Sequence, residues 1–159
     1  MTVNVIFVGA LKEKFFAEAV AEYEKRLLAY CKVNNIIIKD ERLSDKPSAA
    51  EISAALEKEG ERILAALPAR SYKIALCVEG KQLKSEDFAA LFDNVATNGY
   101  GEISFIIGGS FGLSEKVKAA CDKRLSVSLM TFPHRMMRVI LLEQVYRAYN
   151  ILGGGKYHK

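Results

Sequence analysis

The sequence predicts an α/β fold, a mostly parallel sheet with helices on both faces. Short runs rich in β-branched residues alternate along the chain with longer segments of helical periodicity. Apolar residues make up 50% and charged residues 26% of the chain, which is the balance of a globular domain. A length of 159 residues suits one such domain. We therefore expect residues 1–159 to form a single α/β domain.

Each expected element is set by a local pattern. Strands are predicted at residues 3–8, 33–38, 72–78, 103–107 and 125–129. Helices are predicted at residues 12–30, 48–67, 85–97, in a short segment capped by Ser114, and from 133 to about 152. Ser48 and Glu51 form a capping box, and Pro133 suits a first helical turn. Alternating strands and helices favour parallel strands covered on both sides.

Composition limits the classes of partner and compartment. The net charge of +4 permits a polyanionic partner without requiring one. The chain starts with a short apolar run that no basic residue precedes, and no run approaches the length of a membrane span. We therefore expect a soluble cytoplasmic protein that does not enter membranes.

Cysteine and histidine are sparse and scattered. Cys31, Cys77 and Cys121 lie far apart and form no C-x-x-C pair, so we interpret them as free structural thiols rather than nucleophiles. His134 and His158 have no acidic or cysteine partner at metal-ligand spacing. The sequence therefore predicts neither a metal site nor a catalytic triad.

Small and turn-forming residues follow three of the predicted strands, at residues 76–80, 107–112 and 126–132. Because parallel strands end at one edge of a sheet, these three loops should meet. The glycines at 108–112 match neither the dinucleotide-binding nor the Walker phosphate loop. A single loop of this kind is explained equally well by an ordinary strand-to-helix turn and by a ligand site. Three such loops at one edge favour a ligand site, and one that has no phosphate loop.

The closing helix and the tail have features of an interface. The helix carries a wide apolar face that favours a symmetric dimer contact over burial in a monomer, formed by Met137, Leu141, Leu142, Val145, Ala148, Tyr149 and Leu152. Basic residues gather in the same region, at Arg135, Arg138, Arg147, Lys156 and Lys159. Ordinary solvated charge explains them equally well, although Tyr157 among cations suits stacking on an unpaired base.

Four motifs lie in a familiar order: Phe105-Ile-Ile-Gly-Gly, Ser128-Leu-Met-Thr-Phe-Pro-His134, Leu142-Glu-Gln-Val-Tyr-Arg-Ala-Tyr149 and the terminal Tyr157-His158-Lys159. Together they resemble the ribosomal RNA large subunit methyltransferase H family. The resemblance covers the whole chain and is strongest from about residue 72.

The resemblance implies a SPOUT-class methyltransferase. Such an enzyme transfers a methyl group from S-adenosylmethionine to N3 of a pseudouridine in 23S ribosomal RNA of the assembled 70S ribosome. The resemblance also implies an obligate homodimer and a trefoil knot in the C-terminal half. Strand and helix patterns alone argue against a knot, because threaded connections are rare among folds.

Site residues follow from the resemblance position by position. The adenosylmethionine contacts would be Leu76, Gly108, Val127, Ser128, Leu129, Met130, Thr131 and Phe132. We expect His158 to act as a base, Arg138 or Lys159 to stabilise the deprotonated nucleobase, and Tyr157 to stack on it. No metal is required.

The sequence departs from the family pattern in two places and leaves two alternative functions open. Arg135 stands where glutamine is common, and Gly154-Gly155-Lys156 replaces a more acidic approach to the terminal motif. Both changes lie near the expected RNA side. A non-catalytic ribosome- or RNA-binding module on the same fold is one alternative. A nucleotide- or flavin-dependent enzyme on a flavodoxin-like sheet is the other, weakened by the missing phosphate loop.

Overall fold

The computed structural model describes residues 1–158, and Lys159, for which a role on the RNA side is expected, lies outside the described residues. A five-stranded sheet is formed by β1 (Thr2–Val8), β2 (Lys32–Ile38), β3 (Ser71–Gln82), β4 (Glu102–Ile107) and β5 (Lys123–Ser126). The strand order is β2-β1-β4-β3-β5, and every pairing is parallel. The predicted parallel sheet is confirmed.

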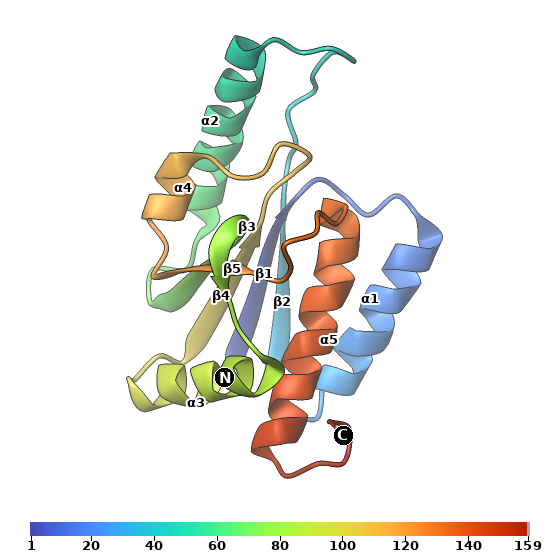
Figure 1. Cartoon of the computed structure of the whole chain (residues 1–159), viewed down its shortest axis with the longest axis vertical. Coiled ribbons are helices and arrows are strands. Elements are labelled where there is room, and N and C mark those ends of the chain that lie inside the picture. Colours follow the sequence, from blue (N-terminus) through green and yellow to red (C-terminus); the bar gives the residue numbers. More distant parts are fainter. Residues whose placement is uncertain (159) are drawn as a thin grey trace.

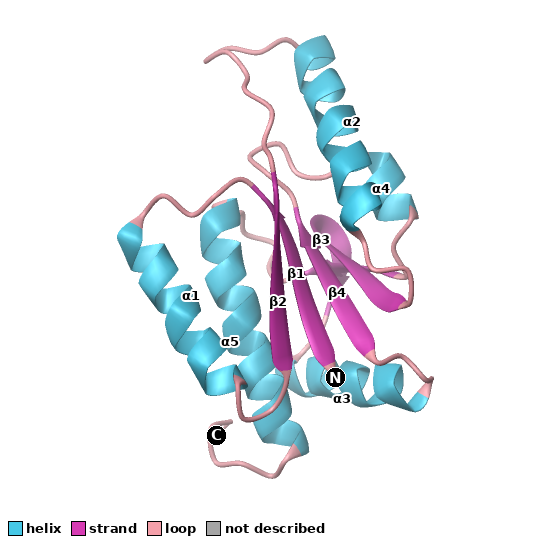
Figure 2. Cartoon of the chain, turned by 180° about the vertical axis from the view of Figure 1, so that it is seen from behind, coloured by secondary structure: helices cyan, strands magenta, loops and turns pink. Residues whose placement is uncertain are grey.

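Helices cover both faces of this sheet, as predicted (Figure 1). One face carries α1 (Lys14–Leu27), α3 (Ser85–Thr97) and α5 (His134–Leu152), and the other carries α2 (Ala49–Ala66) and α4 (Glu115–Ala119) (Figure 2). Alternate β1 side chains enter the two cores: Phe7 packs with α1, α3 and α5, whereas Ile6 packs with α2 and α4. None of the described helices is long and apolar enough to cross a membrane.

Local capping signals set the helix starts. The Ser48 Oγ accepts a hydrogen bond from Glu51 N at 3.2 Å, and the Glu51 carboxylate accepts one from Ser48 N at 2.7 Å, which completes the expected capping box. Ser114 caps α4 through the backbone N–H of Val117. The first helix begins two residues later than predicted, after its N-cap Glu13, and ends at Leu27 rather than at residue 30.

The pairing of β3 with β5 departs from the sequence prediction. Leu125 pairs with Leu76 and again with Lys81, so residues 77–80 leave the ladder between two stretches of pairing and β3 runs on beyond its predicted end. The predicted strand at 125–129 is wrong after Ser126. There the Ser126 hydroxyl bonds the carbonyl of Ser128 at 2.9 Å and turns this edge strand, which pairs with β3 alone, away from the sheet.

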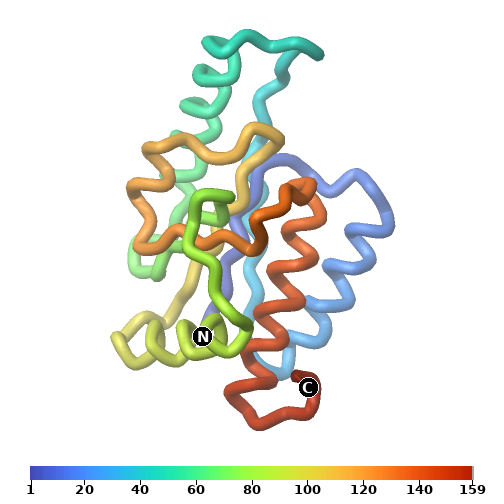
Figure 3. The backbone as a smooth tube through the Cα atoms, viewed as in Figure 1, coloured from blue at the N-terminus to red at the C-terminus, as the bar shows by residue number. Residues whose placement is uncertain are grey.

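Gly80 makes this arrangement possible. In Figure 3 the chain after α4 (orange), which contains β5, runs beside the last part of β3 (green). A Cβ atom on Gly80 would lie 2.4 Å from the carbonyl carbon of Leu125 and 2.7 Å from the nitrogen of Ser126. Two backbones therefore touch where no side chain fits. The crossing lies in the segment where the resemblance implies a knot, and the knot itself stays a prediction.

Helix α5 packs between α1, α3 and the sheet. Its residues Leu141, Leu142, Val145 and Ala148 are buried within the chain, while Leu152 near its end is 46% exposed. Most of the apolar face that we interpreted as a dimer contact is thus covered by the chain's own helices. The homodimer stays a prediction, and the packing of α5 does not support it.

We expect Gly80→Ala to destabilise the fold by about 1–3 kcal/mol or more, because the new methyl group would overlap the backbone of β5. Urea unfolding followed by circular dichroism measures this change. The control is Gly101→Ala, since a Cβ there would meet no atom within 4 Å, and its effect should stay within about 0.5 kcal/mol. Equal stability of the two variants would contradict the importance of the crossing.

Candidate functional site

The carboxyl ends of β3, β4 and β5 meet the starts of α1 and α5 around a cavity of about 1040 Å³. All three loops expected to form a ligand site line it. Of the residues expected to contact the cofactor, those that line the cavity are Leu76, Gly108, Val127, Ser128, Met130, Thr131 and Phe132. Leu129 is not among the lining residues and is 86% exposed. The assignment of these residues to a cofactor stays a prediction.

The loop after β4 exposes main-chain atoms to this cavity. Gly108, Gly109 and Gly112 line the cavity, and Gly109 and Gly112 pair as an isolated bridge with a 3.0 Å backbone hydrogen bond. A Cβ on Gly108 would lie 2.2 Å from the carbonyl oxygen of Gly112, and Gly112 has a φ of 81°. The turn therefore needs glycine at both positions, and it offers a ligand backbone groups in place of side chains.

Apolar side chains surround the cavity and lie open to solvent. Val78, Phe111, Val127 and Met130 all line it and are all among the exposed large hydrophobic residues, with Met130 74% exposed. Leu129 lies beside them in sequence. Large apolar groups gathered at a cavity indicate a surface that something else covers.

Two ion pairs line the same cavity, and sequence reasoning missed both. Glu13, the N-cap of α1, pairs with Arg135 in the first turn of α5. Glu79, in the stretch of β3 that leaves the ladder, pairs with Lys118 of α4. The Lys118 side chain lowers the pKa of Glu79, so that carboxylate is ionised at neutral pH. The two residues of the first pair are 122 positions apart in the sequence, and those of the second are 39 apart. Such separations leave no local sequence signal.

His134 also lines the cavity, at the first position of α5. Burial, and then the charge of Arg135, lower its pKa below the ordinary value, so its ring is neutral at pH 7. Sequence reasoning tested this residue only as a metal ligand. Among residues 1–158 no group of three or more His, Cys, Asp or Glu side chains is placed to hold a metal ion.

The cysteines are all free and partly buried. Burial raises the pKa of each thiol, and that of Cys121 reaches about 11. Cys77 lines the cavity but stays protonated at neutral pH, which makes it a poor nucleophile. The interpretation of the cysteines as free structural thiols agrees with this environment.

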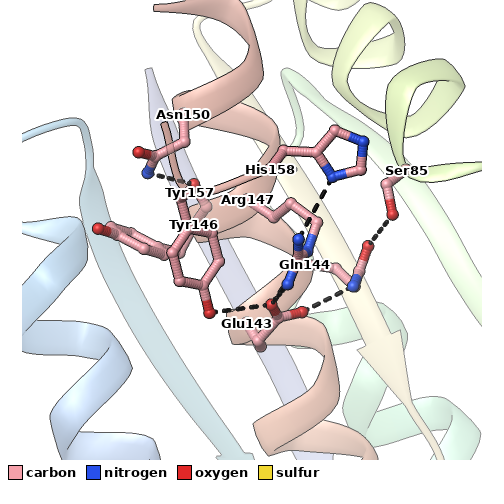
Figure 4. Close-up of polar contacts among 8 residues, drawn as sticks. All are labelled: Ser85, Glu143, Gln144, Tyr146, Arg147, Asn150, Tyr157 and His158. Carbon is pink, nitrogen blue, oxygen red and sulfur yellow. Dashed lines mark hydrogen bonds and ion pairs between the residues drawn. The ribbon is translucent and has the colours of Figure 1, made fainter. Parts of the chain in front are cut away.

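The tail residues lie against the last turns of α5 (Figure 4). The Tyr157 hydroxyl donates to the Glu143 carboxylate at 3.2 Å, and the Arg147 guanidinium lies 4.7 Å from the Tyr157 ring centroid. His158 lies between Arg147, at 3.3 Å, and Glu86 of α3, at 3.1 Å. Burial, together with Tyr23 and Glu143, raises the pKa of Tyr157 to about 12, so its hydroxyl is protonated.

Within one chain, the tail and the cavity lie at opposite ends of α5 (Figure 1). Glu143 and Arg147, which contact the tail, lie roughly 14 and 20 Å along the helix axis from its first residue, His134. Arg138, expected to act beside the tail, is buried instead, with its guanidinium 3.9 Å from the Phe7 ring centroid and 3.5 Å from the Glu24 carboxylate. One chain therefore assembles the expected cofactor residues but not the expected catalytic ones.

The fold and the cavity define an α/β protein with a candidate ligand site at the carboxyl edge of a parallel sheet, lined by glycine backbone and without a phosphate loop. A family model described as "Predicted SPOUT methyltransferase" matches residues 1–158. The chain belongs to the SPOUT methyltransferase family and is an enzyme of that class.

Curated relatives match along their whole length. Proteins named ribosomal RNA large subunit methyltransferase H are 50% identical in Streptococcus thermophilus, 48% in Streptococcus agalactiae and 46% in Listeria monocytogenes, each over 100% of both chains. The resemblance read from the motifs is confirmed. A probable methyltransferase from Bordetella pertussis Tohama I shares the fold, with a TM-score of 0.58 and 15% identity over 92% of this chain and 93% of that one.

We expect His134 to make the free energy of unfolding depend on pH. Because its folded pKa lies below the ordinary 6.5, the unfolded chain binds more protons in this range, and stability is lost as pH falls from about 6.5 through the folded pKa. Urea unfolding of the wild type and His134→Asn between pH 7.5 and 5 measures this loss, and parallel curves for the two proteins would contradict the assignment.

Proposed function

We propose that this chain methylates N3 of a pseudouridine in 23S ribosomal RNA of the assembled 70S ribosome, with S-adenosylmethionine as donor, in the cytoplasm. The observation that carries the proposal is the cavity at the carboxyl edge of the sheet, lined by glycine backbone and apolar side chains. Full-length similarity to proteins named ribosomal RNA large subunit methyltransferase H supports the choice of RNA.

The cavity suits an adenosine-containing ligand without phosphates. Its volume is comparable to that of ligand pockets, about 300–1,000 Å³. Leu76, Val127 and Phe132 supply apolar contacts for a ring, and the backbone at Gly108 and Gly112 supplies groups for hydroxyl and amino substituents. When bound, the donor supplies a methyl group on a sulfonium centre. The protein then has to hold the accepting nitrogen in line with that methyl group.

Removal of the N3 proton is the second requirement, and the tail is our candidate for it. His158 would accept the proton, Tyr157 would stack on the nucleobase, and Lys159 would stabilise the deprotonated base. Arg138 was our other candidate cation, and its burial against Phe7 and Glu24 makes it the weaker of the two.

The separation of the tail from the cavity supports an antiparallel homodimer. Tyr157 and His158 pack against Glu143 and Arg147 of α5 and do not line the cavity of their own chain. A second copy placed head to tail would bring its tail to this cavity, and the exposed Val78, Phe111 and Met130 would gain a covering partner. Each of the two active sites would then take its donor pocket from one chain and its base from the other.

The first test is transfer of labelled methyl from S-adenosylmethionine to 70S ribosomes that lack the modification, with the labelled nucleotide mapped by mass spectrometry. We expect label on a single large-subunit pseudouridine. A variant lacking residues 157–159 should bind the donor as the wild type does and lose at least about 100-fold in transfer rate, the scale of general-base catalysis. Donor binding without transfer by the wild type would favour the non-catalytic RNA-binding module.

The dimer predicts that two inactive variants complement each other. One lacks residues 157–159, and the other carries Thr131→Trp, which adds bulk at an exposed cavity position without disturbing the core. Co-expressed with two different affinity tags, the mixed dimer has one complete site. We expect about half of wild-type activity for purified mixed dimers, because one of two sites is intact. No recovery in mixed dimers would show that the tail does not act in the partner's cavity.

A further inference from the structure

The Glu13–Arg135 pair has unused hydrogen-bonding capacity inside the cavity. Both side chains line the cavity and are about 30% exposed. Among the described residues, Glu13 Oε2 and Arg135 Nε are buried and have no hydrogen-bond partner. Buried polar atoms without partners are uncommon in folded proteins, and here both belong to residues that line the cavity, where a bound ligand or water can supply the partner.

The pair offers one anionic and one cationic group side by side. Such a pair complements an α-amino-acid end, in which an ammonium and a carboxylate lie on the same carbon. The carboxylate of Glu13 can accept from an ammonium, and the guanidinium of Arg135 can donate to a carboxylate. A neutral pair facing a neutral zwitterion also leaves no net charge buried after binding.

The surroundings of Arg135 favour the same orientation. It lies in the first turn of α5, whose N-cap Pro133 has no side chain that caps the helix and whose first turn contains no acidic residue. The backbone N–H groups of that turn add to the attraction of a carboxylate beside Arg135. The other ion pair of the cavity, Glu79 with Lys118, lacks this unused capacity. Lys118 is shared between Glu79 and Glu115, and among the described residues none of these three side chains has a buried polar atom without a hydrogen bond.

We propose that Glu13 and Arg135 bind the amino-acid end of the methyl donor, with Glu13 receiving its ammonium and Arg135 its carboxylate. The inference rests on the proposed function and adds two specificity-determining residues to it. Arg135, where the family commonly has glutamine, would then act on the donor side of the site, although its sequence position suggested the RNA side.

The test compares two probes by isothermal titration calorimetry: S-adenosylhomocysteine, and 5′-methylthioadenosine, which shares the adenosine and thioether but lacks the amino-acid end. We expect the wild type to bind S-adenosylhomocysteine at least about tenfold more tightly than 5′-methylthioadenosine. Glu13→Gln and Arg135→Met should each remove most of this difference and leave 5′-methylthioadenosine binding within about twofold. Lys14→Gln, whose side chain is 90% exposed, removes one positive charge nearby and should bind both probes as the wild type does.

A swapped variant, Glu13→Arg with Arg135→Glu, separates recognition from a structural role. It keeps an ion pair between α1 and α5 but exchanges the two charges, so we expect the preference for S-adenosylhomocysteine to stay lost. Recovery of that preference in the swap, or equal losses for both probes in the single variants, would overturn the proposal. A wild type that binds neither probe would instead refute the proposed function itself.

Discussion

The close contact between Gly80 and the backbone of Leu125 and Ser126 is the constraint on which the site depends. It holds the stretch of β3 that leaves the ladder, residues 77–80, against the end of β5, so that both lie beside the glycine turn after β4. Parallel strands bring their carboxyl ends to one edge of a sheet, but this arrangement alone does not bring their backbones into contact. Here a missing side chain allows two backbones to touch, and the ligand cavity forms beside that contact.

The rigidity of α5 is the second constraint. The helix is buried between α1, α3 and the sheet along most of its length, so its two ends keep a fixed separation. Its first turn contributes Pro133, His134 and Arg135 to the cavity. Its last turns hold Tyr157 and His158 through Glu143 and Arg147. A chemistry that needs both ends therefore needs two chains, which makes the dimer part of the proposed mechanism.

The electrostatics of the cavity suit a ligand that carries both charges rather than a polyanion. Two acidic and two basic side chains line it in pairs, and the ring of His134 is neutral at pH 7. A phosphate-binding site would concentrate positive charge, and the glycine turn before α4 lacks the sequence of a phosphate loop. The missing phosphate loop already weakened the alternative of a flavin- or nucleotide-dependent enzyme. The charge balance of the cavity agrees with that.

Much of the fold was readable from the sequence because its signals are local. Alternating β-branched and helical patterns predicted five strands and five helices, and Ser48 with Glu51 marked the start of α2. The three loops expected to form a ligand site line one cavity in the structure, and the motifs identified the family. Short-range periodicity and turn chemistry carry this information, since each depends on neighbours within a few residues.

Tertiary structure decided what depends on distant partners. The double pairing of Leu125, the burial of Arg138 against Phe7 and the pairing of Glu13 with Arg135 all join residues far apart in the chain. The placement of the tail at the far end of α5 is of the same kind. The amino-acid sequence by itself determined which elements form and to which family they belong. Only the packing of those elements determined which side chains share the cavity, because contacts between distant segments leave no periodic signal along the chain.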